Sequence, residues 1–219
     1  MDYKPIFYGY GRGSIFGMSL LHPERKEGAK TINGETWFYR VIDDGSLEIT
    51  GGTHHNEHRT IPAKLNGKSV VWIGKWAFKD DKILTGIEIS QGIVTINDLA
   101  FSGCERLAMV TIPASVVRID PHAFLGCCAL EKFVVDSVNE AYKSDSGVLL
   151  TKDGRILQQG VNGNVRIPDR VEIIREHALL EEIQGGENAA LEFKEVRPND
   201  SWKFMKTVVA FANERGGRS

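Results

Sequence analysis

The amino-acid sequence predicts a mainly β fold: a solenoid of about four turns, preceded by a β-hairpin cap and followed by a short α/β tail. Two consecutive stretches, 84–107 and 107–130, share the pattern L-x-x-[IV]-x-I-x-x-x-[IV]-x-x-I-x-x-x-A-F-x-x-C-x-x-L at an interval of about 23 residues. An interval of that length is typical of coils in which each repeat forms one turn. Near the start of each repeat, apolar and polar residues alternate, as in a short strand with one buried face.

Part of the pattern extends beyond these two repeats, because V-x-x-I-x-x-x-A recurs at Val70–Ala77 and at Val171–Ala178. One turn offers about five large apolar side chains, worth roughly 1.5 to 3 kcal/mol each when buried. Ordering the chain costs roughly 1.5 kcal/mol per residue. A single turn is therefore unstable alone, and we expect the turns to stack on one another.

Stacking at a fixed interval predicts rows of equivalent side chains inside the coil. The predicted aromatic row contains Phe78, Phe101, Phe124 and, as a poorer continuation, Leu179. Cysteines occupy another equivalent position, so we expect Cys104 and Cys127 to be buried, reduced and adjacent, and Cys128 to point outward.

The N-terminal third is predicted to contain an arm, a cap and a loop. Residues 1–33 show no clear pattern and are expected to form a poorly ordered or loosely packed arm. Two β-prone runs on either side of Asp43-Asp44-Gly45 predict a hairpin over residues 36–50 that caps the first turn. The loop that follows holds His54, His55 and His58. Because no cysteine or carboxylate lies at a familiar ligand spacing beside them, we expect solvated side chains and no metal.

A second irregular segment interrupts the coil over residues 136–165. In it, two apolar runs flank Lys152-Asp153-Gly154, which predicts an inserted hairpin. The repeat resumes at Ile167-Pro168, so the solenoid region is predicted to span residues 34–183.

The repeats resemble a known family. T-I-P-A-S-V-V-R-I-D-P-H-A-F-L-G-C at Thr111–Cys127 and I-N-D-L-A-F-S-G-C at Ile96–Cys104 are similar to BspA-type leucine-rich repeats. The resemblance covers roughly residues 37–180. It implies a right-handed leucine-rich-repeat solenoid that binds other macromolecules and does not catalyse a reaction.

The tail, residues 184–219, carries a different resemblance. L-E-F-K-E at Leu191–Glu195 and K-T-V-V-A-F-A-N-E-R-G-G at Lys206–Gly217 resemble the start of a Schlafen-AlbA domain, a family associated with nucleic acids. Glu187 and Glu192 match the first two glutamates of its acidic cluster. The third acidic residue and most of that domain are missing from the sequence, so we expect an inactive pair and no cleavage of RNA or DNA.

Basic residues of the tail are the candidates for contact with nucleic acid. We expect at most weak, salt-sensitive binding through four of them: Lys194, Lys203, Lys206 and Arg215. An apolar arc on the predicted helix of the tail favours either a fold-back cap on the solenoid or a tail-mediated dimer.

Composition sets the remaining expectations. The net charge of −2 gives no general attraction to nucleic acid or to an anionic membrane, and no apolar run approaches membrane-spanning length. Three cysteines and the absence of a visible signal sequence favour a cytoplasmic protein, with a cell-surface or secreted protein as the alternative if a leader was removed. We expect a monomer, unless the tail pairs two chains.

The predicted function is a non-catalytic interaction module that binds an unknown protein or glycan partner without a cofactor. The alternative is a fragment of a nucleic-acid-binding regulator in which the repeats are fused to a Schlafen-AlbA domain.

Overall fold

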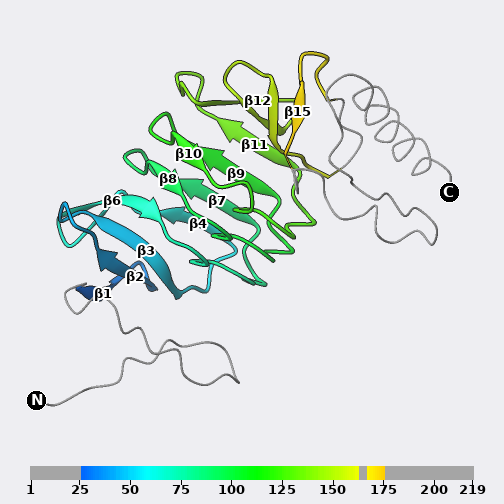
Figure 1. The fold of residues 1–219 in the computed structure, drawn as a ribbon. Helices are drawn as coiled ribbons and strands as arrows, with labels where there is room; N and C mark the ends of the chain where they lie inside the picture. The colour runs from blue at the N-terminus through cyan, green and yellow to red at the C-terminus, as the bar shows by residue number, and fades with distance from the viewer. Residues whose placement is uncertain (1–25, 163–166, 176–219) are drawn as a thin grey trace, which may run out of the picture.

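The computed structural model describes residues 26–162 and 167–175 of the chain. In these ranges all regular structure is β-strand, joined by turns and bends. The strands follow one another as rungs of one coil (Figure 1). The predicted β-solenoid is therefore confirmed for this part of the chain. No described segment forms an apolar helix of membrane-spanning length.

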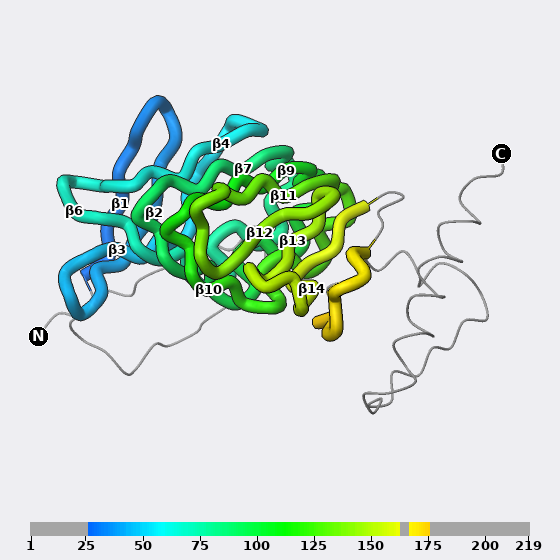
Figure 2. Tube along the Cα trace, turned by 90° about the horizontal axis from the view of Figure 1, so that it is seen from above, coloured from blue at the N-terminus to red at the C-terminus, as the bar shows by residue number. Residues whose placement is uncertain are grey.

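One side of the coil is a parallel sheet with one strand from each turn, in the order β11-β9-β7-β4. Its strands are β4 (His58–Ile61), β7 (Gly86–Ile89), β9 (Met109–Ile112) and β11 (Lys132–Val135). Their register aligns Arg59 with Ile87, Ile87 with Val110, and Val110 with Phe133. Figure 2 shows these strands one behind another. The repeat interval of the sequence thus becomes a row of buried side chains, three of them apolar.

A second sheet joins the cap to the coil in the order β1-β2-β3-β6-β8-β10, and β5 also pairs with β6. These strands are β1 (Glu27–Ile32), β2 (Glu35–Val41), β3 (Leu47–Thr53), β5 (Lys64–Leu65), β6 (Lys68–Ile73), β8 (Thr95–Ile96) and β10 (Arg118–Ile119). Strands β2 and β3 form an antiparallel hairpin, and β3 pairs in parallel with β6. The hairpin therefore covers the edge of the first turn, as a cap should.

Strand β1 lies inside the predicted N-terminal arm, so the arm's boundary at residue 33 is wrong for residues 27–32. It pairs antiparallel with β2 across Asn33-Gly34, where both residues have positive φ angles of 51° and 81°. Asn-Gly is a strong signal for this kind of tight turn. The signal was easy to miss because β1 is mostly exposed and lacks a clear apolar face. Residues 1–25 lie outside the described part of the chain.

The predicted aromatic row is confirmed. The rings of Phe78 and Phe101 are stacked at a centroid distance of 5.1 Å with planes 10° apart, and those of Phe101 and Phe124 at 5.3 Å and 4°. Trp37 meets Phe78 edge-on at 6.2 Å, and Phe133 meets Phe124 edge-on at 5.2 Å. The row is thus closed at both ends by aromatic side chains. Leu179 lies outside the described residues.

The cysteine row is also as predicted. Cys104 and Cys127 are buried free thiols, whereas Cys128 is exposed. The Cys104 thiol donates to the carbonyl oxygen of Phe78 at 3.0 Å, and the Cys127 thiol donates to that of Phe101 at 3.2 Å. The Cys104 contact and burial raise the pKa of the Cys127 thiol.

Thiol labelling should separate these cysteines. In the native state, Cys128 should react with a maleimide much faster than Cys104 and Cys127, because Cys128 is exposed whereas the other two thiols are buried. Mass spectrometry of labelled peptides at successive times measures the three rates. Equal native rates for all three thiols, at the value seen in denaturant, would contradict the buried row.

The segment after β11 forms a meander of β12 (Tyr142–Asp145), β13 (Val148–Thr151) and β14 (Ile156–Gln159). Strands β13 and β14 pair antiparallel around Lys152-Asp153-Gly154, where the sequence predicts a hairpin. The pairing of β12 with β13 around Ser146-Gly147 was not predicted. Strand β15 (Ile173–Ile174) then pairs in parallel with β14.

Side chains of this meander cover the open edge of the coil. The Asn139 amide donates to the carbonyl oxygens of Pro113 and Val116 at 2.8 and 2.9 Å, and the Tyr142 hydroxyl accepts from the Ile119 amide at 2.8 Å. Gln158 donates to the Ile119 carbonyl at 3.1 Å. The backbone groups that a further turn would pair are therefore satisfied by side chains.

Candidate functional site

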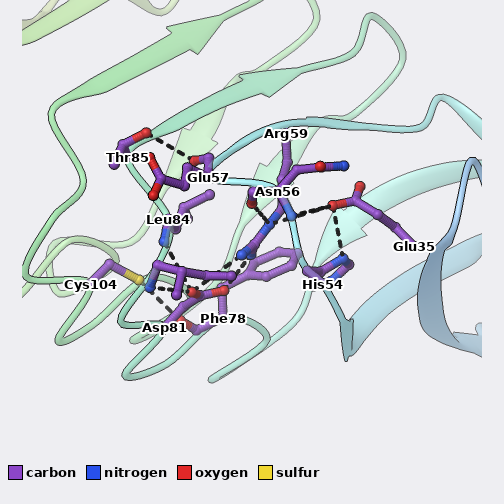
Figure 3. A network of polar contacts seen from close by, with 11 residues as sticks. Glu35, His54, Asn56, Glu57, Arg59, Phe78, Asp81, Leu84, Thr85 and Cys104 are labelled. Atoms are coloured by element: carbon purple, nitrogen blue, oxygen red, sulfur yellow. Dashed lines mark hydrogen bonds and ion pairs between the residues drawn. The ribbon is translucent and has the colours of Figure 1, made fainter.

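A buried polar network joins the N-terminal cap to the first turn of the coil (Figure 3). At its centre is Arg59 in β4, whose side chain is 0% exposed. Its Nε donates to the carbonyl oxygen of Asn56 at 2.7 Å, and its two terminal nitrogens both donate to Asp81. Glu35 in β2 places Oε1 3.8 Å from Nε of Arg59. All three nitrogens of the guanidinium thus donate to acceptors of the protein itself.

Strand alternation explains why an arginine lies inside. In β4, His58 and Thr60 are exposed, whereas Arg59 and Ile61 point into the core. Arg59 holds the position that Ile87 occupies in the next turn. A charge in an apolar row is tolerated only when it is paired and hydrogen-bonded.

Asp81 is the main partner of that arginine and is itself well supported. Its Oδ1 accepts the backbone amides of Ile83 and Leu84, each at 3.1 Å. Burial alone would raise the pKa of Asp81, but hydrogen bonds from Arg59 and from the two amides outweigh it and lower the pKa below its usual value. Asp81 therefore stays ionised opposite the guanidinium.

His54 corrects one prediction, because its side chain is not solvated. It is 3% exposed and lies 4.5 Å from the Trp37 ring and 5.7 Å from the Phe78 ring, measured between centroids. Neither ring nitrogen has a hydrogen-bond partner among the described residues. The cap hairpin brings Trp37 onto the loop, which the local sequence does not reveal. His55 and His58 are exposed, as predicted.

This environment makes neutral His54 the stable form. Burial, followed by the nearby charge of Arg59, lowers the pKa of His54 from 6.5 to about 4. Between pH 6.5 and pH 4, His54 is therefore protonated in the unfolded chain and mostly neutral in the folded chain. The contribution of neutral His54 to the free energy of unfolding is fully present above pH 6.5 and is lost as the pH falls towards 4.

We predict that this residue alone removes about 3 kcal/mol of stability between pH 7 and pH 4, since each pKa unit corresponds to about 1.4 kcal/mol. Urea unfolding of the wild type and of His54→Leu at several pH values measures it. The variant should show a shallower fall of unfolding free energy in this window, while His55→Gln, exposed and one residue away, should keep the wild-type slope. Identical slopes in His54→Leu and wild type would contradict a buried neutral imidazole.

The Arg59 side chain is 0% exposed and all three of its nitrogens donate to acceptors of the protein, which favours a structural role for the network. The surface offers a different feature: an open groove of about 610 Å³ on the second sheet. The groove is lined by residues from β2, β3, β6, β10 and the turns beside them: Arg40, Ile42, Asp43, Asp44, Glu48, Trp72, Lys75, Asn97, Asp98, Arg118 and Asp120. We define these residues as the sheet groove.

Two cations of the sheet groove are paired inside it. Arg40 and Glu48 form an ion pair across β2 and β3, with Nε and Oε2 at 3.0 Å. The Lys75 ammonium lies 2.6 Å from Oδ2 of Asp98. These pairs hold the lining side chains in place and reduce the free charge of the groove.

Two tryptophans in and after β6 are exposed, and the first of them, Trp72, lines the sheet groove. Trp72, the last but one residue of β6, is 39% exposed, and Trp76, in the turn that follows, is 45% exposed. The Lys75 ammonium lies 4.5 Å from the centre of the Trp76 ring. Exposed tryptophans beside a groove are frequent anchors in binding surfaces.

Asp98, Asp120 and His122 bring three metal-ligand side chains within 4.8 Å of one another. The His122 Nδ1 atom lies 3.5 Å from Asp98 and 3.4 Å from Asp120. The Lys75 ammonium already contacts Asp98, so a protein cation partly neutralises this cluster.

The site residues predicted from the sequence all lie outside the described part of the chain. These are Lys194, Lys203, Lys206, Arg215, Glu187 and Glu192. The sheet groove was missed. One signal was available: in K-S-V-V-W-I of β6 a tryptophan occupies an outward, normally polar position.

Comparison with known proteins finds a match in the repeat region. A family model described as the BspA type leucine rich repeat region matches residues 60–146 with six copies. No curated protein matches the chain. Nothing found supports the Schlafen-AlbA resemblance of the tail.

Several solved structures are similar to the chain. They include a leucine-rich repeat protein from T. pallidum, at 22% identity over 62% of this chain and 60% of that chain, with a TM-score of 0.44. A second is a leucine-rich repeat protein from Bacteroides ovatus, at 19% identity over 72% and 37%, with a TM-score of 0.40. A third is from Bacteroides capillosus, at 23% identity over 50% and 99%, with a TM-score of 0.37. The chain thus spans 60% of the T. pallidum structure.

Proposed function

We propose that this chain, which carries a BspA-type leucine-rich-repeat region over residues 60–146, is a non-catalytic interaction module that binds a polypeptide partner along the sheet groove. The observation that carries the proposal is the groove itself, with its partly exposed Trp72 and its ring of charged side chains. Stacked repeats form continuous surfaces to which an extended partner can bind across several turns.

The groove has the chemical make-up of a binding surface. A tryptophan supplies a large apolar contact, and the surrounding ion pairs supply hydrogen-bonding groups already fixed in position, which lowers the ordering cost of binding. The residues lining the groove include no serine, cysteine or tyrosine nucleophile.

A peptide-display library selected on the purified protein tests this function. We expect selected peptides to bind the wild type and to bind Trp72→Ala at least tenfold more weakly, since a tryptophan anchor typically contributes 2 kcal/mol or more. Val134→Ala is the control, because Val134 is 43% exposed on the other parallel sheet. The proposal would be refuted if the selected peptides bound Trp72→Ala as tightly as the wild type, or if the selection yielded no binding peptide.

A further inference from the structure

The charge of the sheet groove is unbalanced. Its lining contains five carboxylates and three cationic side chains. Two cations are paired, Arg40 with Glu48 and Lys75 with Asp98. For the remaining carboxylates, Asp43, Asp44 and Asp120, the lining offers a single further cation, Arg118, and Asp120 also lies 3.4 Å from Nδ1 of His122.

Two of the excess carboxylates, Asp44 and Asp120, accept hydrogen bonds from neighbouring residues. Hydrogen bonds from the hydroxyl and the amide of Ser46 lower the pKa of Asp44. Oδ1 of Asp120 accepts the amide of His122 at 3.0 Å. Both carboxylates are therefore fixed in direction before any ligand arrives.

Trp72 lies among these charges. In the sheet it is flanked by Glu48 of β3 and Thr95 of β8. A partly exposed indole face beside carboxylates is a favourable place for a cation, because the ring and the carboxylates both attract positive charge.

The molecule already holds one cation in this manner. The Lys75 ammonium lies 4.5 Å from the centre of the Trp76 ring and 2.6 Å from Oδ2 of Asp98. Trp72 lines the same groove as Asp43, Asp44 and Asp120, while its neighbour Glu48 is already paired with Arg40.

We infer that the partner's contact segment is an extended basic peptide, with a lysine or arginine side chain on Trp72 and further cations near Asp43, Asp44 and Asp120. This inference rests on the proposed function and names the chemistry of its partner. The groove crosses strands β2, β3, β6, β8 and β10. Four strand spacings of about 4.8 Å give about 19 Å, which about six extended residues span.

Fluorescence anisotropy with labelled hexalysine and hexaglutamate tests the inference at low and physiological salt. We expect hexalysine to bind and hexaglutamate not to bind. The Asp43→Asn, Asp44→Asn double variant should weaken hexalysine binding about tenfold or more. Trp72→Ala should weaken it about twofold to fivefold, the usual range for an exposed cation over an aromatic ring.

A matched control removes two negative charges elsewhere: Glu131→Gln with Glu140→Gln, both exposed and outside the groove. It should leave the affinity for hexalysine within about twofold of the wild type. Equal weakening by both double variants would show a general charge effect and overturn the inference. Unchanged unfolding midpoints of the variants exclude loss of fold as the cause.

Failure of the inference can be told from failure of the proposed function. If display-selected peptides depend on Trp72 but are neutral or acidic, the proposed function stands and the basic partner is wrong. If no peptide binds and a glycan array yields a ligand that depends on Trp72, both are wrong.

Discussion

Replacing Phe101 with alanine should destabilise the protein by about 3 to 5 kcal/mol. Phe101 is 0% exposed and its ring is stacked on both faces, by Phe78 and by Phe124. The lost ring leaves a cavity in the middle of the row, where the rigid backbone of the stacked strands hinders collapse. Since domains are typically stable by about 5 to 15 kcal/mol, the variant should be close to unfolding at 37 °C.

Thermal and urea unfolding, followed by far-ultraviolet circular dichroism, measure the effect. Lys132→Ala is the control, because Lys132 is exposed on β11. Phe101→Leu, which keeps most of the volume, should fall between the control and Phe101→Ala. A midpoint for Phe101→Ala equal to that of Lys132→Ala would mean that the stacked register is wrong.

The second large effect is expected at Arg59. Arg59→Met keeps the length of the side chain but leaves Asp81 and Glu35 without their buried cation. Removing one partner of a buried ion pair typically costs about 3 to 5 kcal/mol, because the other charge stays desolvated and unpaired. We expect a loss of that size in the free energy of unfolding.

A second substitution should reverse part of this loss. In Arg59→Met with Asp81→Asn, residue 81 carries no charge, yet its amide oxygen can still accept the Ile83 and Leu84 amides. The double variant should therefore be more stable than Arg59→Met alone. Lys82→Met, which removes the exposed partner of Glu105, is the control and should leave the midpoint nearly unchanged. Additive losses in the double variant would show that the two residues are not energetically coupled.

The sequence alone determined the solenoid and its internal rows. Period and alternation are local properties, and a constant interval places each side chain beside its equivalent in the next turn. Phe101 and Cys104 were therefore placed correctly from spacing alone. The β2–β3 hairpin was found because Asp43-Asp44-Gly45 carries a local turn signal, whereas β1 was missed for want of an apolar face.

Only the tertiary structure decided the polar interior and the candidate site. Arg59 is buried because Glu35 and Asp81, 24 residues before it and 22 after it, reach it from other elements. His54 has a lowered pKa because Trp37 and Phe78 exclude water from it. The sheet groove gathers residues 40 to 120 from successive strands. The burial, the pKa and the surface charge of a residue depend on which side chains of neighbouring turns contact it. A repeat pattern specifies the spacing of the turns, but it does not specify contacts between side chains that differ from one turn to the next.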